Sequence, residues 1–186
     1  STLNFFPAGF GTWLTSADSV SAATPLATQS ATYLQLLLGN VSGSFGETSA
    51  LLILLGGAFI IVKKTANWKI VAGSAGGFLV LQTILWLAGH PNASDPLYGL
   101  LSGSFLFGMC FMITDPVSSS QSTDIGRWVY GALFGLLTVV IRVFANWAEG
   151  VTFAILLVNM FGPLFDYYFK QMKAKKKVKA KAGGAA

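Results

Sequence analysis

The chain has 186 residues, of which 53% are hydrophobic and only 10% are charged. Soluble domains usually carry about 25% charged residues, so this composition, with a mean hydropathy of +0.63, excludes an ordinary soluble domain and predicts an all-α integral membrane protein. The net charge of +5 does not indicate a nucleic-acid partner, because seven of the 12 basic residues lie together within residues 170–186.

The first predicted region, residues 1–45, is an arm that contains one unusual stretch, DSVSAATPL at 18–26. Pro25 biases the backbone of Thr24 toward an extended conformation. Ser21 and Ala23 add little bulk beside the Thr24 hydroxyl, so a modifying enzyme could reach it. A plain loop is the competing interpretation, because stretches rich in small polar residues are common in loops.

Residues 31–38 are apolar but too short to cross a membrane, since a spanning helix needs about 20 residues. They are either a half-helix that dips into the bundle, as broken helices do in transporters, or a surface helix.

A bundle of about five transmembrane helices is predicted over residues 46–169. Its apolar segments are residues 46–62, 68–88, 97–113, 127–145 and 149–169. Small residues recur at a spacing of four, which lets helix backbones approach closely in lipid. These pairs are Gly73/Gly77, Gly99/Gly103, Ser104/Gly108 and Gly131/Gly135.

The connections between the predicted spans alternate in charge. Residues 63–69, Arg127 and the tail at 170–186 carry Lys or Arg, whereas residues 90–95 and 146–149 carry none. Cytoplasmic loops are enriched in Lys and Arg. The basic connections and the tail, which is expected to be disordered, are therefore predicted to be cytoplasmic, and Thr24 is predicted to lie on the outer face.

The residue types exclude several kinds of site. His90 is the only histidine and lies in a loop, and the single cysteine, Cys110, cannot form an internal disulfide. No cluster has metal-ligand spacing, and no triad or carboxylate pair indicates hydrolysis.

Ionisable groups at predicted spans are functional candidates because they are costly in a membrane. Glu47 opens the first span, where the helix dipole also favours an acid. Asp115 precedes Pro116, and an Asp-Pro turn is its alternative explanation. Asp166 lies near the end of the fifth span, where a pair with Lys170 at i+4 competes with a functional role. Pro163 leaves the carbonyl of Asn159 without its helical donor.

Several motifs, taken in order along the chain, resemble those of a known family. The stretch DSVSAAT at 18–24 resembles the flavinylation motif Asp-Gly-x-Ser/Thr-Gly-Ala-Ser/Thr, with Ser19 and Ala22 in place of its glycines. Further blocks are GSFGETS at 43–49, TDPVS at 114–118, IRV at 141–143, AEG at 148–150 and GPLFD at 162–166. Together they resemble the NqrB/RnfD family, whose members are membrane subunits of the sodium-pumping NADH:quinone reductase and of the related Rnf electron-transport complex. WKIVAG at 68–73 favours the former complex and Thr24-Pro25-Leu26 the latter.

The resemblance implies that the chain is the C-terminal half of such a subunit, and one half of a urea-transporter-like inverted-repeat fold. It implies FMN bound covalently to Thr24 by a flavin transferase, with electrons relayed from NADH toward quinone in the bacterial inner membrane. Implied partners are the lipid bilayer and other subunits, including a second flavinylated one. Riboflavin and quinone sites would be shared with the missing half. The aromatic residues of the arm either lie at the membrane interface or pack around the flavin ring.

The resemblance also places Asp115 and Asp166 on acids of a sodium uptake path, with Glu47 as a further candidate. Arg142 is expected to pair with Glu149 across a short outer turn, and the alternative is that it reaches the FMN phosphate. For the whole chain, two other classes remain open: a channel or transporter half without redox function, and a purely structural membrane subunit.

Overall fold

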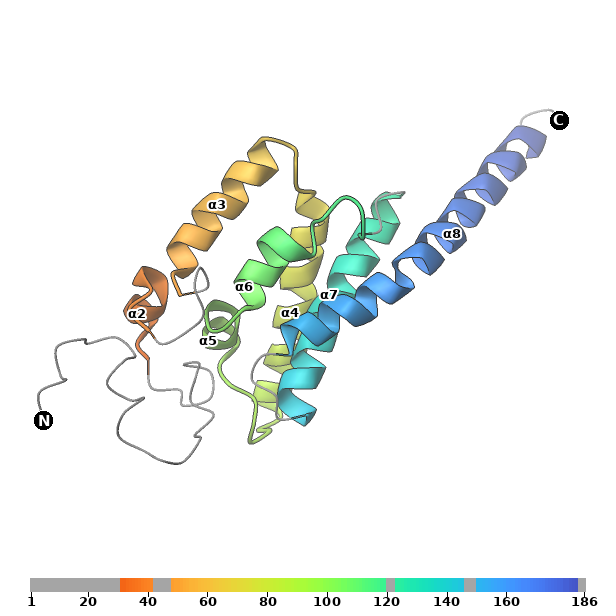
Figure 1. The fold of residues 1–186 in the computed structure, drawn as a ribbon. Helices are drawn as coiled ribbons and strands as arrows, with labels where there is room; N and C mark the ends of the chain where they lie inside the picture. The colour runs from red at the N-terminus through yellow and green to blue at the C-terminus, as the bar shows by residue number, and fades with distance from the viewer. Residues whose placement is uncertain (1–30, 42–47, 120–122, 146–149, 184–186) are drawn as a thin grey trace, which may run out of the picture.

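The computed structural model describes residues 31–41, 48–119, 123–145 and 150–183, with side chains described as far as residue 175. Its described residues are helical and contain no strand. The elements are α2 (Tyr33–Leu38), α3 (Ala50–Val62), α4 (Trp68–Leu87), α5 (Pro96–Leu101), α6 (Phe105–Phe107), the π-helix η2 (Gly108–Met112), α7 (Asp124–Phe144) and α8 (Val151–Gly183) (Figure 1).

Within the described chain, three helices are long and apolar enough to cross a membrane, where about five spans were predicted. They are α4, α7 and the Val151–Lys175 part of α8. The first predicted span is found as α3, whose 13 residues reach only about 20 Å at 1.5 Å per residue. That length is less than the hydrocarbon core of about 30 Å. Residues 46 and 47, with which this span was predicted to begin, lie outside the described residues.

The third predicted span is not one helix. It is interrupted between α5 and α6, where Ser102 has an extended backbone and Gly103 has a φ of +74°. Glycine adopts this left-handed conformation readily and commonly ends helices in this way. Hydropathy alone does not reveal such a break, because the flanking segments are equally apolar.

The C-terminal tail was expected to be disordered. In the structure it is helical, because α8 continues to Gly183. Two physical reasons explain the helix. Its Lys and Ala residues are good helix formers, and an existing helix extends more easily than a new one nucleates. In Figure 1, α8 crosses α7 obliquely and its C-terminal part extends beyond the other helices.

Helices α4 and α7 pack with their backbones in contact along a glycine seam. A Cβ added at Gly77 would lie 2.4 Å from the carbonyl oxygen of Ala132, and one added at Gly135 would lie 2.2 Å from that of Ser74. Gly131 makes the same kind of approach to Ile70. The small residues spaced four apart in α4 and α7 therefore let the two helix backbones approach closely, as the sequence predicted.

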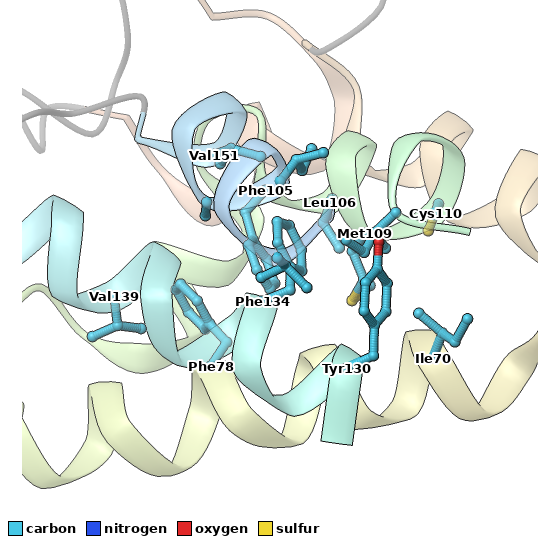
Figure 2. Close-up of a cluster of buried hydrophobic side chains, with 14 of the residues drawn as sticks. Ile70, Phe78, Phe105, Leu106, Met109, Cys110, Tyr130, Phe134, Val139 and Val151 are labelled. Atoms are coloured by element: carbon cyan, nitrogen blue, oxygen red, sulfur yellow. The ribbon is translucent and has the colours of Figure 1, made fainter. Parts of the chain in front are cut away.

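The core lies between this helix pair and the broken segment. Phe105 of α6 stacks on Phe78 of α4 and on Phe134 of α7, with ring centroids 4.3 Å and 5.5 Å apart. Figure 2 shows these rings grouped under Val151, the first residue of α8. All four side chains are almost fully buried, so this cluster holds α6 against the α4–α7 pair.

The helix ends gather at two ends of the bundle. Helix α3 ends and α4 and α7 begin at the upper end in Figure 1, while α4 and α7 end and α5 begins at the lower end. The basic residues Lys63, Lys64, Lys69 and Arg127 therefore lie together at the upper end, as the alternation of loop charge predicted.

Candidate functional site

Part of the predicted site cannot be placed. The residues that lie outside the described chain are Thr24, Ser21, Ala23, Glu47 and Glu149. FMN attachment, the Glu47 role and the Arg142–Glu149 pair therefore stay predictions. The structure does place Asp115, Asp166 and Arg142, and they lie in two different environments.

Asp115 lies in a turn that follows η2 at the upper end of the bundle. Its carboxylate accepts hydrogen bonds from the Ser118 hydroxyl at 2.8 Å, from the Ser118 amide at 3.2 Å and from the Val117 amide at 3.4 Å. The bond from the Ser118 hydroxyl, followed by that from the Val117 amide, holds the pKa of Asp115 below its usual range. The turn therefore presents an ionised carboxylate at this end of the bundle.

This turn packs on α8 beside Tyr130 of α7. A Cβ added at Gly162 of α8 would lie 3.2 Å from the Ser118 carbonyl oxygen and 3.7 Å from the Tyr130 ring. The Tyr130 hydroxyl donates a hydrogen bond to the side-chain oxygen of Asn159, one turn before Gly162 on α8. Tyr130 is fully buried and lies within electrostatic range of Asp115. We call Asp115, Ser118, Tyr130, Asn159 and Gly162 the polar junction.

Asp166 lies on the same face of α8 as the polar junction. It follows Asn159 by seven residues and Gly162 by four, and such positions share one helix face. The Asp166 side chain is half-buried. Pro163 lies within α8 and has no amide hydrogen, so the Asn159 carbonyl lacks its helical donor.

The junction is rich in oxygen atoms rather than in nitrogen or sulfur. Carboxylate and carbonyl oxygens are the ligands that hard cations prefer. No group of three or more His, Cys, Asp and Glu side chains forms a metal site in the part of the chain that the structure describes. The oxygen atoms of the polar junction are of the ligand type that a hard cation can contact.

Charged residues also pair across the glycine seam near this end. Asp124 opens α7 and forms salt bridges with Lys69 of α4 at 2.7 Å and with Arg127 at 2.9 Å. The Lys69 bridge joins the two helices at the end where Asp115 lies, whereas the Arg127 bridge lies within the first turn of α7. The two salt bridges give Asp124 a structural role.

Arg142 lies at the lower end of the bundle, in the last turn of α7, and is 8% exposed. Its guanidinium donates to the carbonyl oxygen of Gly99 at 2.8 Å and to that of Ser102 at 3.5 Å. The charged group lies near the rings of Phe78 and Phe105, at 5.6 Å and 5.9 Å from their centroids. Arg142 therefore points into the break between α5 and α6.

Two buried polar features were not predicted as site residues. Tyr130 was missed because its pairing with Asn159 depends on how α7 and α8 are rotated. Gln82 of α4 is 3% exposed and donates to the carbonyl of Ser94 at 2.9 Å, tying α4 to the loop before α5. A glutamine within an apolar span was the signal that could have found it.

The short helix α2 anchors the end of the N-terminal arm. The Tyr33 hydroxyl donates to the carboxylate of Asp95, which caps α5, and its ring packs edge-on against Tyr98. The Ser49 hydroxyl, at the start of α3, donates to the Leu37 carbonyl at 3.0 Å. Helix α2 is thus fixed to both α3 and α5, and it is too short to span the membrane.

Comparison with known proteins identifies the family. The profile of the NQR2, RnfD, RnfE family matches residues 2–175. The chain is 42% identical over 183 residues to the B-type subunit of the Na(+)-translocating NADH-quinone reductase of Klebsiella pneumoniae (strain 342), covering 88% of this chain and 44% of that protein.

The same B-type subunit from two other bacteria shows similar agreement. The protein of Pseudomonas aeruginosa (strain LESB58) is 38% identical, over 91% of this chain and 46% of its own length. That of Neisseria meningitidis serogroup A (strain DSM 15465 / Z2491) is 41% identical, over 84% of this chain and 39% of its own length. The chain thus spans less than half the length of these relatives. With its apolar helices, this similarity makes it a multi-pass membrane protein, and the chain belongs to the NQR2, RnfD, RnfE family.

Proposed function

We propose that the chain is part of the B-type membrane subunit of a sodium-translocating NADH:quinone reductase and carries one FMN bound covalently to Thr24. The observation that carries the proposal is the 42% identity to such a subunit across 88% of the chain. The protein acts as an oxidoreductase only within the assembled complex. FMN supplies the redox chemistry when bound, and the protein positions it and tunes its environment.

The chain's own contribution is to hold the flavin at one end of the bundle. Helix α2 is the described element closest in sequence to Thr24, and it is fixed to α5 through Tyr33 and Asp95. This contact supports the proposal that the N-terminal arm, which contains Thr24, is held at the lower end of the bundle. There a second flavinylated subunit would deliver electrons, and riboflavin and quinone would accept them within the complex.

The proposal includes a sodium uptake path that begins at the polar junction and Asp166, with Glu47 as a further acid. Its support is geometric. Asp115 presents an ionised carboxylate, and Asn159 and Asp166 share the face of α8 against which the Asp115 turn packs. Hard cations favour such oxygen ligands.

The direct test is to co-express the complex with its flavin transferase and separate its subunits on a denaturing gel. A fluorescent flavin band at the position of this protein, with an intact mass increased by one FMN, is expected. A band without flavin fluorescence would support the alternative of a channel or structural subunit and would overturn the redox proposal.

The proposed orientation has its own test. The basic residues at the upper end of the bundle support a cytoplasmic location of that end in a bacterial inner membrane. In the proposed orientation Thr24 lies on the outer face. A cysteine introduced at Ser16 should react with an impermeant thiol reagent in intact cells, whereas one at Ala180 should not. The reverse pattern of labelling would invert the topology.

A further inference from the structure

The upper end of the bundle carries two lysines that no described carboxylate neutralises. Lys63 and Lys64 follow α3, are exposed, and form no salt bridge within the part of the chain that the structure describes. The other two basic residues at this end, Lys69 and Arg127, are both bridged to Asp124. This end therefore presents surplus positive charge to an external partner.

The conformation of the turn after α3 also points to a role for the two lysines. The Lys63 ammonium lies 5.7 Å from the centroid of the Phe59 ring, and Phe59 is 62% exposed on α3. The cation thus lies beside exposed apolar surface, where an anionic partner would offset the cost of removing it from water. Lys64 has a φ of +58°, a left-handed conformation that is costly for residues other than glycine and asparagine. The turn keeps a lysine where an uncharged residue would fit the backbone more easily.

Two exposed tryptophans lie close to these lysines. Trp68 begins α4 four residues after Lys64, so their Cα atoms are at most about 14 Å apart. Trp68 contacts Trp128 of α7 edge-to-face, with ring centroids 5.9 Å apart, and the two residues are 54% and 42% exposed. Figure 1 shows the end of α3 and the starts of α4 and α7 at the same end of the bundle. Because tryptophan is enriched where membrane hydrocarbon meets the headgroups, the surface combines cations with apolar rings suited to that depth.

We propose that this surface, formed by Lys63, Lys64, Trp68 and Trp128, binds an anionic phospholipid of the phosphatidylglycerol type. The two ammonium groups bind the headgroup phosphate, and the indole rings lie against the glycerol and the upper part of an acyl chain. Basic residues near a membrane attract anionic lipids, whereas a zwitterionic headgroup carries its own cation, which opposes the lysines. A free phosphate ion would leave the apolar rings without a partner, so the composition of the surface favours the lipid.

The experiment labels the surface directly and needs no redox turnover. The assembled complex is reconstituted into phosphatidylcholine vesicles that contain a small fraction of phosphatidylglycerol with a photoreactive group high on one acyl chain. After illumination, labelled peptides are mapped by mass spectrometry, and we expect label on peptides that contain Trp68 or Trp128. The same photoreactive group on phosphatidylcholine should label them at least about tenfold less, because that headgroup has no net negative charge to attract the lysines.

Matched variants separate the two lysines from general surface charge. Lys63→Gln combined with Lys64→Asn removes both charges, and asparagine tolerates the left-handed backbone. It should lower phosphatidylglycerol labelling at least about tenfold, since each lysine adds to the attraction. Lys63→Arg combined with Lys64→Arg keeps the charges and should retain the labelling. Lys173→Gln combined with Lys175→Gln removes the same charge from exposed positions of α8 and should have no effect.

Labelling that depends on the two lysines and on the phosphatidylglycerol headgroup supports the proposal. It is overturned if the parent shows no label on these peptides, because another part of the complex then covers the surface, or if the variant without the two lysines is labelled as strongly as the parent. Loss of label on adding excess inorganic phosphate at constant ionic strength would identify a free-anion site and overturn it as well. Lys64→Asn alone carries the test if the double variant does not assemble. The proposal rests on the membrane location and not on the flavin, so flavin fluorescence remains a separate test of the proposed function.

Discussion

The Tyr130 hydroxyl on α7 donates a hydrogen bond to the Asn159 side chain on α8, across 29 positions of sequence. This bond links the two long helices beside the turn that carries Asp115. Because Gly162 lets the same turn pack on α8, the pair is the centre of the polar junction, and its loss should affect both stability and the proposed ion path.

Tyr130→Phe should destabilise the complex modestly, because it removes the donor but keeps the ring. Interhelical hydrogen bonds in membrane proteins contribute about 0.6–2 kcal/mol. Thermal unfolding of the assembled complex measures the effect as a lower Tm. Tyr167→Phe is the matched control, because Tyr167 lies on α8, the helix of Asn159, and is 64% exposed. Equal Tm values for both variants would show that the Tyr130 bond contributes nothing.

The glycine seam predicts a larger and position-specific effect. Gly135→Ala would place a methyl group 2.2 Å from the Ser74 carbonyl oxygen, so α4 and α7 would have to separate. Overpacking of this kind typically costs about 1–3 kcal/mol. Gly76→Ala is the control, because a Cβ at Gly76 meets no atom within 4 Å. We expect a lower Tm and weaker assembly for Gly135→Ala alone, and similar behaviour of the two variants would contradict the seam.

Asp115 gives a prediction for pH dependence. Its pKa is lowered from 3.8 by the Ser118 hydroxyl and the Val117 amide, so the folded state favours the ionised form. The resulting stabilisation is fully present above the unfolded pKa and is lost as pH falls through the folded pKa. The parent should therefore be more stable than Asp115→Asn near neutral pH, and the difference should shrink as pH falls below 3.8. Thermal unfolding over a pH series measures it, and a difference that grows on acidification would refute the assignment.

The sodium path predicts a kinetic change without loss of flavin. Asp166→Asn and Asp115→Asn should each raise the sodium concentration needed for half-maximal quinone reduction, because each removes an oxygen anion from the path. Asp124→Asn is the matched control, since Asp124 lies at the same end, at the start of α7, and is not part of the polar junction. If the first two variants keep the sodium dependence of the parent, these acids are structural.

The long helices could be predicted from sequence because both their apolar content and their boundaries are local properties. Helix α4 begins at Trp68 as predicted, after Asn67 caps it by accepting a hydrogen bond from the Lys69 amide. Helix α7 begins a few residues earlier than predicted. Thr123 caps it there, because its hydroxyl oxygen accepts a hydrogen bond from the Gly126 amide. Hydropathy finds the apolar stretch, and the capping side chain sets its start.

Other features depend on information that hydropathy does not contain. The break at Gly103 is a backbone conformation, and the contact of Arg142 with Gly99 joins residues 43 positions apart. The pairing of Tyr130 with Asn159 depends on the relative rotation of two helices. Sequence could nominate Arg142 as a functional candidate, because charge in a span is costly, but it could not identify the carbonyl groups that satisfy it.

The central claim, covalent FMN on Thr24, is tested most directly by mapping the flavin within the protein. The assembled complex is purified from cells that contain the flavin transferase, and its peptides are analysed by mass spectrometry. We expect the added FMN on the peptide that contains Thr24, its complete loss in Thr24→Ala, and partial retention in Thr24→Ser, which keeps a hydroxyl. Flavin that remains covalently bound in Thr24→Ala, or that maps to another peptide of this chain, would contradict the claim.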